Sequence, residues 1–257
     1  MVGLKNIVYN LKNTTMKKYT TTNIIKTLFI LTLALSLNAC YFKNIKGNGH
    51  VTIEDRSVSN FSKIQVSSAI TVIYTQDPTY SVKVKADDNL IKYITTEVHG
   101  TELRIGIKKG KSFRKVTELI VYISAASIDK IDLSGASTFT STNAMDASNL
   151  TMMLSGASTL TVYGNFNSIN GDLSGASHTT ISGTTSICTF EGSGASNYHT
   201  SALTTNTAIV NLSGASICSL TITNNLTANL SGASVVDYYG NPTITSDLSG
   251  SSSVNKK

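Results

Sequence analysis

The chain has 257 residues, 40% of them apolar, so it is long enough to bury a substantial core, which argues against general disorder. Its formal net charge of +6 would suit nucleic acid, but five lysines precede residue 40, where there is no carboxylate. The rest of the chain contains 16 basic and 15 acidic residues, so its net charge is close to zero. The composition therefore excludes a basic nucleic-acid-binding surface as the chain's main feature.

Residues 1–39 have the pattern of an export signal. A basic stretch precedes an uncharged apolar run at 27–39, which is too short to cross a membrane comfortably. The run ends in Leu37-Asn38-Ala39-Cys40, which resembles the lipobox of bacterial lipoproteins, although Asn38 is a less usual residue there. The resemblance implies cleavage before Cys40 and several acyl chains on that residue, enough for a stable membrane anchor.

Translation is expected to start at Met16, because Lys17-Lys18 follows it as in many bacterial signals. The alternative for residues 1–39 is an N-terminal membrane helix with a coincidental cysteine. Mass spectrometry of the mature protein distinguishes them, since a peptide that retains residues before Cys40 would contradict the lipoprotein. Residues 40–48 are expected to form a lipidated tether.

Residues 49–130 alternate apolar and polar side chains in short runs, such as Ile70/Val72/Tyr74 and Leu103/Ile105/Ile107. A period of two predicts strands with one buried face. Turn residues at Asp77-Pro78 and Gly110 separate the runs. We expect irregular short strands here, without a strong helix.

Residues 131–253 contain seven versions of the phrase Leu-Ser-Gly-Ala-Ser, at steps of 18 to 21 residues. A fixed period of this length is typical of a solenoid, in which each repeat buries its apolar face by stacking on its neighbours. Alternate residues before each phrase are mostly apolar, as in Leu150/Met152/Leu154 and Ile244/Ser246/Leu248, and are predicted to point inward. A strand of about five residues, a corner and a Thr-rich strand then make one coil of a parallel β-helix, and residues 49–257 form a single all-β domain.

The repeated phrase is predicted to be the corner of each coil. Coils stack about 4.8 Å apart, so a bulky corner residue would clash in every layer. Glycine permits a sharp turn, serine can hydrogen-bond the turn backbone, and the alanine is expected to fit the narrow end of the core. The corner glycines are Gly135, Gly156, Gly175, Gly194, Gly214, Gly232 and Gly250.

The stretches at 47–77 (GNGHVTIEDRSVSNFSKIQVSSAITVIYTQD) and 81–108, followed by the SGAS phrases, resemble the lipoprotein-associated family described as putative auto-transporter adhesin, head GIN domain. The resemblance covers residues 49–253. It implies a right-handed parallel β-helix of pectin-lyase-like architecture, a suspected role in adhesion and no established enzymatic residues. The sequence departs from the family at Ser68-Ala69, where Gly-Gly is common, and at Gly192, which replaces a leucine of the other repeats.

The sequence shows no recognisable catalytic set. Enzymes that cleave polyuronides on a β-helix combine carboxylates with Arg or Lys, but residues 131–255 contain neither basic residue. Arg56, Arg104 and Arg114 are expected to be solvated or ion-paired. His178 and His199 lie at different offsets from their phrases, so they need not stack.

Asp172 and Glu191 are predicted to be outward neighbours on successive coils. Two carboxylates at that spacing either recruit a cation or splay into water, and only the first alternative makes them metal ligands. No cofactor is expected. Cys188 and Cys218 are expected to be buried free thiols, because no His or carboxylate cluster accompanies them. Aromatic residues suited to carbohydrate or protein contacts are Tyr163, Phe166, Tyr198, Tyr238 and Tyr239.

We therefore expect a non-enzymatic, lipid-anchored protein of a Gram-negative cell envelope, which mediates surface interaction or adhesion. The lipid on Cys40 would attach it to the outer membrane, and a glycan or a host or envelope protein would be its partner. Two alternatives stay open: a periplasm-facing structural or assembly lipoprotein, and a carbohydrate-active enzyme with a β-helix fold. The face of the membrane and the oligomeric state are also left open.

Overall fold

The computed structural model describes residues 43–58 and 60–257. The predicted signal at 1–39, the start at Met16 and the lipidated Cys40 lie outside the described residues. The buried core side chains all belong to the compact unit 44–257. This unit therefore has its own hydrophobic core and is expected to fold by itself.

The unit consists mainly of β-strands, with one helical turn, α2 (Asp88–Ile91). The first strands are β1 (Lys43–Lys46), β2 (Val51–Arg56), β3 (Lys63–Val66), β4 (Thr71–Gln76), β5 (Ser81–Asp87), β6 (Ile94–His99), β7 (Glu102–Ile107), β8 (Lys111–Arg114) and β9 (Leu119–Ala125). The strands that follow are β10 (Lys130–Leu133), β11 (Thr138–Ser141), β12 (Met145–Leu154), β13 (Thr159–Leu173), β14 (His178–Gly192), β15 (Asn197–Leu212), β16 (Ile217–Leu230), β17 (Val235–Gly240), β18 (Thr243–Leu248) and β19 (Ser253–Lys256).

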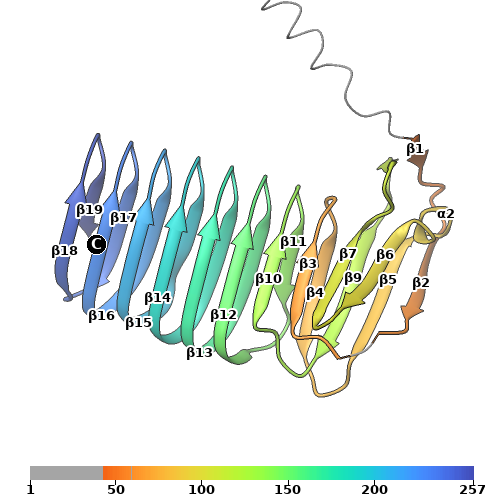
Figure 1. The fold of residues 1–257 in the computed structure, drawn as a ribbon, viewed down its shortest axis with the longest axis horizontal. Helices are drawn as coiled ribbons and strands as arrows, with labels where there is room; N and C mark the ends of the chain where they lie inside the picture. The colour runs from red at the N-terminus through yellow and green to blue at the C-terminus, as the bar shows by residue number, and fades with distance from the viewer. Residues whose placement is uncertain (1–42, 59) are drawn as a thin grey trace, which may run out of the picture. The chain divides into compact units, whose positions relative to one another are not determined.

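The strands from β10 onward stack in parallel register to form a β-solenoid of about seven turns (Figure 1). One stack holds the strands that precede the SGAS corners, where Met152 pairs with Gly171 and Gly171 with Phe190. The other stack holds the strands that follow the corners. The predicted class, all-β with a right-handed parallel β-helix, is confirmed.

Parallel stacking begins before the SGAS repeats. Strands β3 and β4 lie directly on β10 and β11, with Ile64 opposite Ile131 and Val72 opposite Phe139. Antiparallel pairs β2–β5, β5–β9 and β6–β7 then form the amino-terminal end of the stack. Part of residues 49–130 therefore forms a regular turn of the solenoid. This turn could not be predicted from the sequence, because β3 and β4 carry no SGAS phrase.

Part of the predicted tether is a strand. β1 pairs with β8 to form a separate two-stranded sheet. The backbone N–H of Gly47 continues the contact by donating to the carbonyl oxygen of Arg114 at 3.1 Å. Backbone pairing with a segment nearly seventy residues away leaves no local pattern in the sequence, so this strand could not be predicted.

The SGAS corners have the predicted backbone, with Gly194 at φ +75° and the other six corner glycines at similar angles. The predicted side-chain directions were partly wrong. In the six phrases that contain alanine, the alanine is exposed and the serine that follows it is buried, as at Ala157 and Ser158. The Ser158 hydroxyl donates to the carbonyl oxygen of Ser155 at 2.8 Å, and five other corners repeat this bond. A buried hydroxyl satisfied inside its own turn costs little, so serine can occupy the narrow end of the core.

A second column of glycines, which the sequence analysis missed, lies at the opposite corner. Gly164 pairs with Gly183, and a Cβ at Gly183 would lie 1.9 Å from the carbonyl oxygen of Gly164. Strands β13 to β16 run through this corner without interruption. The register shifts between Thr180 and Gly183 and between Thr200 and Thr204 also fall here. The differences in length between repeats, which range from 18 to 21 residues, are therefore accommodated at this corner, and the SGAS corners stay aligned from coil to coil.

Ser68 and Ala69 occupy the corner of the first coil in left-handed conformations, with φ of 74° and 57°. Such angles cost a non-glycine residue about 1–2 kcal/mol. Ser68→Gly should therefore raise the free energy of unfolding by about 0.5–1 kcal/mol, after the greater freedom of glycine in the unfolded chain is counted. Thermal unfolding should show a higher midpoint. An unchanged or lower midpoint would contradict the strain at this corner.

Cys188 and Cys218 are free and fully buried in the described structure, as predicted. Burial raises the pKa of Cys188 to about 12 and raises the pKa of Cys218 well above its ordinary value. Both thiols should therefore stay protonated and unreactive at neutral pH. A thiol-reactive reagent should label neither residue in the folded unit and both after denaturation. Rapid labelling of the native unit would contradict this packing.

Candidate functional site

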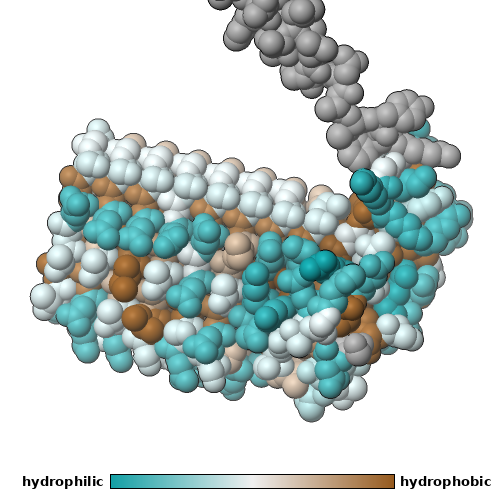
Figure 2. Space-filling view, in the orientation of Figure 1, coloured by the Kyte–Doolittle hydropathy of each residue, from teal (hydrophilic) through white to brown (hydrophobic). Residues whose placement is uncertain are grey.

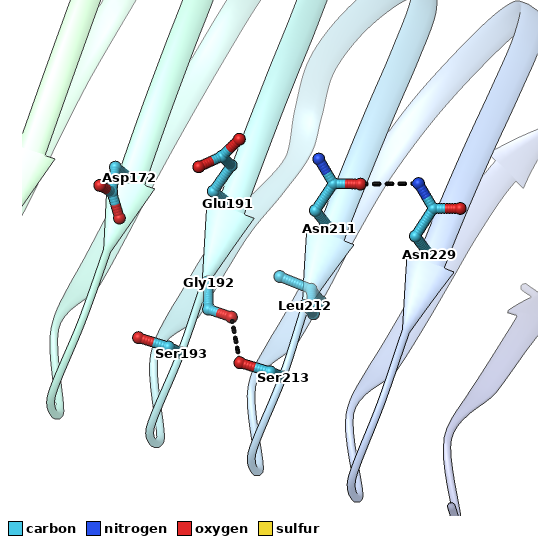
Figure 3. Close-up of a pocket in the computed structure, with 8 residues that line it drawn as sticks. All are labelled: Asp172, Glu191, Gly192, Ser193, Asn211, Leu212, Ser213 and Asn229. Atoms are coloured by element: carbon cyan, nitrogen blue, oxygen red, sulfur yellow. Dashed lines mark hydrogen bonds between the residues drawn. The ribbon is translucent and has the colours of Figure 1, made fainter. Parts of the chain in front are cut away.

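A groove crosses the outer face of the strands that precede the SGAS corners (Figure 3). Its volume is about 420 Å³, and its polar wall is a row of side chains from successive coils. It is lined by Asp172, Glu191, Gly192, Ser193, Asn211, Leu212, Ser213 and Asn229. The groove therefore runs along the stack and spans several coils.

A second hollow, of about 250 Å³, continues the groove toward the amino-terminal end. Asp172 and Glu191 line both hollows, and Met153, 40% exposed, adds an apolar contact at the far side. On this face a hydrophilic row runs parallel to the pale ridge of corners (Figure 2). We call the two hollows together the outer groove.

Strand alternation and coil register place the polar wall. Asp172 pairs with Glu191, Glu191 with Asn211, and Asn211 with Asn229. Each residue immediately precedes the inward residue that leads into a corner, so all four side chains point outward, as predicted for Asp172 and Glu191. The Asn229 side-chain amide donates to Asn211 Oδ1 at 2.8 Å, which fixes the orientation of both amides.

Gly192 lines the groove at the position where the other repeats carry leucine. A Cβ at this residue would lie 2.6 Å from Leu212 Cδ2 and 2.9 Å from Ser196 Oγ. The Ser213 hydroxyl donates to the Gly192 carbonyl oxygen at 3.3 Å, which joins the two coils at the groove edge. The departure at Gly192 therefore leaves the fold intact and coincides with the hollow.

The floor beside the carboxylates is rigid. The Tyr198 ring stacks on Phe190 with centroids 4.4 Å apart, and its hydroxyl donates to the Glu191 carbonyl oxygen at 2.7 Å. Burial, followed by the proximity of the ionisable groups of Cys218, Asp172 and Glu191, raises the pKa of Tyr198 far above its usual range. Tyr198 therefore stays neutral and acts as a fixed hydrogen-bond donor under the groove.

The outer groove offers a row of hydrogen-bonding groups, two of which are carboxylates. No group of three or more His, Cys, Asp or Glu side chains is arranged to hold a metal ion in the part of the chain that the structure describes. Within the row, Asp172 and Glu191 are flanked by Met153 and Asn211. Cation binding by the two carboxylates thus stays a prediction.

The remaining candidate residues lie elsewhere. His178 and His199 belong to the stack that follows the corners and occupy different columns, as their offsets indicated. Arg56 and Arg104 pair with Glu54 and Glu102 at 3.4 and 2.6 Å, and Arg114 is exposed. None of these residues lines the outer groove.

The predicted aromatic surface is only partly present. Tyr163 and Tyr239 are 42% and 41% exposed, but Tyr198 is fully buried and Phe166 is 5% exposed. Tyr198 lies at an inward position of its strand, where it fills the space opposite Gly171. The expectation that Tyr198 and Phe166 lie on the surface was therefore wrong, because large aromatics are needed to fill a core that contains inward glycines.

Comparison with known proteins gives a consistent family assignment. The model of the family described as "Putative auto-transporter adhesin, head GIN domain" matches residues 60–242. No curated protein sequence matches the chain. Among the described residues, no helix has the length and apolar character needed to cross a membrane.

Several solved structures share the fold. A putative adhesin from Bacteroides fragilis NCTC 9343 is 21% identical, with a TM-score of 0.77, and the match covers 82% of this chain and 98% of that chain. A putative lipid binding protein from Parabacteroides distasonis ATCC 8503 is 20% identical, with a TM-score of 0.72 over 84% of this chain and 100% of that chain. A putative adhesin from the same strain is 21% identical, with a TM-score of 0.67 and the same coverage.

Proposed function

The chain belongs to the head GIN domain family of putative auto-transporter adhesins, and from this membership we propose that it is a non-enzymatic adhesion protein of the cell envelope. A lipid on Cys40 anchors it to the outer membrane of a Gram-negative bacterium, and the β-solenoid carries the binding surface. The basic stretch and the apolar run at 27–39 that precede Cys40, and the adhesin description of structural relatives, support this proposal.

The observation that carries the proposal is the outer groove. Its wall presents two carboxylates followed by two amides along the stack, and hydroxyls of Ser193 and Ser213 line its other edge. Such groups accept and donate hydrogen bonds at the spacing of successive coils, about 4.8 Å. This surface suits an extended ligand rich in hydroxyl groups, so a glycan is the proposed ligand class.

The adhesin description of the family and of its structural relatives favours binding over catalysis. The outer groove carries two carboxylates on adjacent strands of one exposed face and contains no His, Lys or Arg. The proposed protein holds its ligand without cleaving it, and the assay below also detects cleavage.

Glycan and glycoprotein arrays test this function with the purified unit 43–257. The unit should bind at least one immobilised glycan, and the paired variant Asp172→Ala/Glu191→Ala should lose at least about tenfold in affinity, since each hydrogen bond to a charged group contributes about 1.5–3 kcal/mol. Thr180→Ala/His199→Ala changes two exposed residues of the opposite stack and should bind like the parent.

Three results would contradict the proposed function. These are a failure of the unit to bind any glycan or glycoprotein on the arrays, binding of the groove variant as tight as that of the parent, and shortening of a bound glycan by the parent. The last result would instead establish the carbohydrate-active alternative. Thermal unfolding of each variant ensures that a loss of binding is not a loss of fold.

A further inference from the structure

Charge is divided unevenly along the described unit. Residues 43–130 contain 14 Lys or Arg against 9 Asp or Glu, whereas residues 131–255 contain 6 Asp or Glu and no Lys or Arg. The first segment forms one end of the stack and the second forms the remaining coils (Figure 1). The unit is therefore positive at its amino-terminal end and negative along its repeats.

Much of this positive charge gathers in one place, which we call the basic cluster. Its backbone is held by two hydrogen bonds: Lys108 N donates to the Tyr93 carbonyl oxygen at 2.9 Å, and Lys111 N donates to that of Lys108 at 3.0 Å. The Nζ atoms of Lys92 and Lys111 lie 5.4 and 5.6 Å from the centroid of the Tyr93 ring. The cluster comprises Lys46, Lys92, Lys108, Lys109, Lys111 and Arg114.

The basic cluster is not neutralised by the protein. Ion pairs among the described residues 43–58 and 60–257 involve Arg56, Lys83, Lys85 and Arg104 in this end of the molecule, and none involves a cluster residue. Nearby carboxylates have other partners. Asp88 accepts a hydrogen bond from Asn48 at 2.5 Å, and Glu97 lies 3.4 Å from His99. The cluster therefore leaves its charges available to an external anion.

The position of the cluster indicates which anion is within reach. Strand β8, which carries Lys111 and Arg114, pairs with β1, the first strand of the described chain. Only two residues lie between Cys40 and Lys43, so the two Cα atoms are at most about 10 Å apart. An acyl chain on Cys40 would thus bring a membrane surface close to the cluster.

We propose that the basic cluster binds the anionic lipid headgroups of the membrane that holds Cys40. This inference rests on the proposed lipid anchor for its location, although the charge complementarity belongs to the described unit alone. Lipid anchors act together with polybasic patches, and each Lys or Arg near an anionic surface strengthens binding. The acidic repeats are repelled by the same surface, so the solenoid is held by its amino-terminal end, and the outer groove lies on the coils beyond that end.

Vesicle binding by the unlipidated unit 43–257 tests the proposal. The unit should sediment with vesicles that contain phosphatidylglycerol, bind much more weakly to pure phosphatidylcholine, and dissociate as salt is raised. Lys108→Gln/Lys109→Gln should weaken binding to the anionic vesicles by about 25-fold, since each lysine contributes roughly fivefold. Lys256→Gln/Lys257→Gln removes the same charge from the opposite end and should have little effect.

The proposal is overturned if binding does not depend on phosphatidylglycerol, or if the two double variants lose affinity equally. Displacement of the unit from vesicles by inorganic phosphate at concentrations too low to act by general screening would also overturn it, because a free phosphate site would then explain the binding. The lipid anchor is checked separately by mass spectrometry of Cys40. An unmodified Cys40 with retained vesicle binding would refute the anchor and leave the cluster's lipid affinity intact.

Discussion

Gly194→Val should lower the free energy of unfolding of the unit by about 3 kcal/mol or more. Gly194 has φ +75°, an angle that is strongly unfavourable for a β-branched residue. A Cβ at this position would also lie 2.6 Å from the Gly175 carbonyl oxygen. That oxygen accepts a hydrogen bond from Ala195 N at 2.8 Å, so it cannot move away without loss of a contact between coils.

Denaturant unfolding of the parent and the variant measures this effect. Ala195→Val is the matched control, because it adds the same kind of side chain to the next residue of the same corner, where the structure places it in solvent. The control should stay within about 0.5 kcal/mol of the parent. Equal losses in the two variants would mean that the glycine and the alanine have been assigned the wrong directions.

Tyr198→Ala should destabilise the unit by about 3–5 kcal/mol, as is usual when a buried aromatic residue is truncated. The side chain is fully buried, it stacks on Phe190, and its hydroxyl donates to the Glu191 carbonyl oxygen. Tyr198→Phe removes only that hydrogen bond and should cost about 1 kcal/mol. Tyr163→Ala changes an exposed tyrosine two coils away and should cost much less than Tyr198→Ala.

A double-mutant cycle with Gly171 tests why Tyr198 is needed. A Cβ at Gly171 would lie 2.9 Å from Tyr198 Cε1, so Gly171→Ala should destabilise the parent by overpacking. In the Tyr198→Ala background the same methyl group enters a cavity and should be neutral or stabilising. Additive effects of the two substitutions would contradict the account that the tyrosine ring occupies the space left by the glycine.

The features that repeat along the chain could be predicted from the sequence. Seven SGAS phrases at steps of 18 to 21 residues predict stacked coils, and a period of two predicts which side chains face the core. The same reasoning placed Asp172 and Glu191 side by side on the outer face, where the structure has them. Each coil stacks on the previous one in the same way, so residues at equivalent positions of successive repeats are in contact. A pattern that recurs along the sequence therefore predicts contacts between coils.

Other features depend on contacts that leave no such pattern. The inward/outward alternation of side chains along a strand does not continue through a corner that contains a left-handed glycine. The prediction therefore placed the alanine of each phrase in the core, where the structure has the serine that follows it. The same counting assigned Ile244 and Leu248 to the core. They keep the inward register but are 38% and 43% exposed, because no further coil of the described residues covers them.

The outer groove and the basic cluster could not be predicted from the sequence, for different reasons. Gly192 lines the groove, and the shape of the groove there depends on how Leu212 and Ser196 pack around that residue. The basic cluster joins residues from three separate segments, at 46, 92 and 108–114, through β1–β8 pairing and the contacts of Tyr93. Neither arrangement follows from spacing along the chain.

The most direct test of the proposed adhesion function is whether the solenoid faces the cell exterior. An antibody raised against the repeats should label intact cells that express the protein as strongly as permeabilised cells, while an antibody against a soluble periplasmic protein should label only the permeabilised ones. Labelling of the repeats only after permeabilisation would place the solenoid on the periplasmic side, contradict adhesion and favour a structural or assembly role in the envelope.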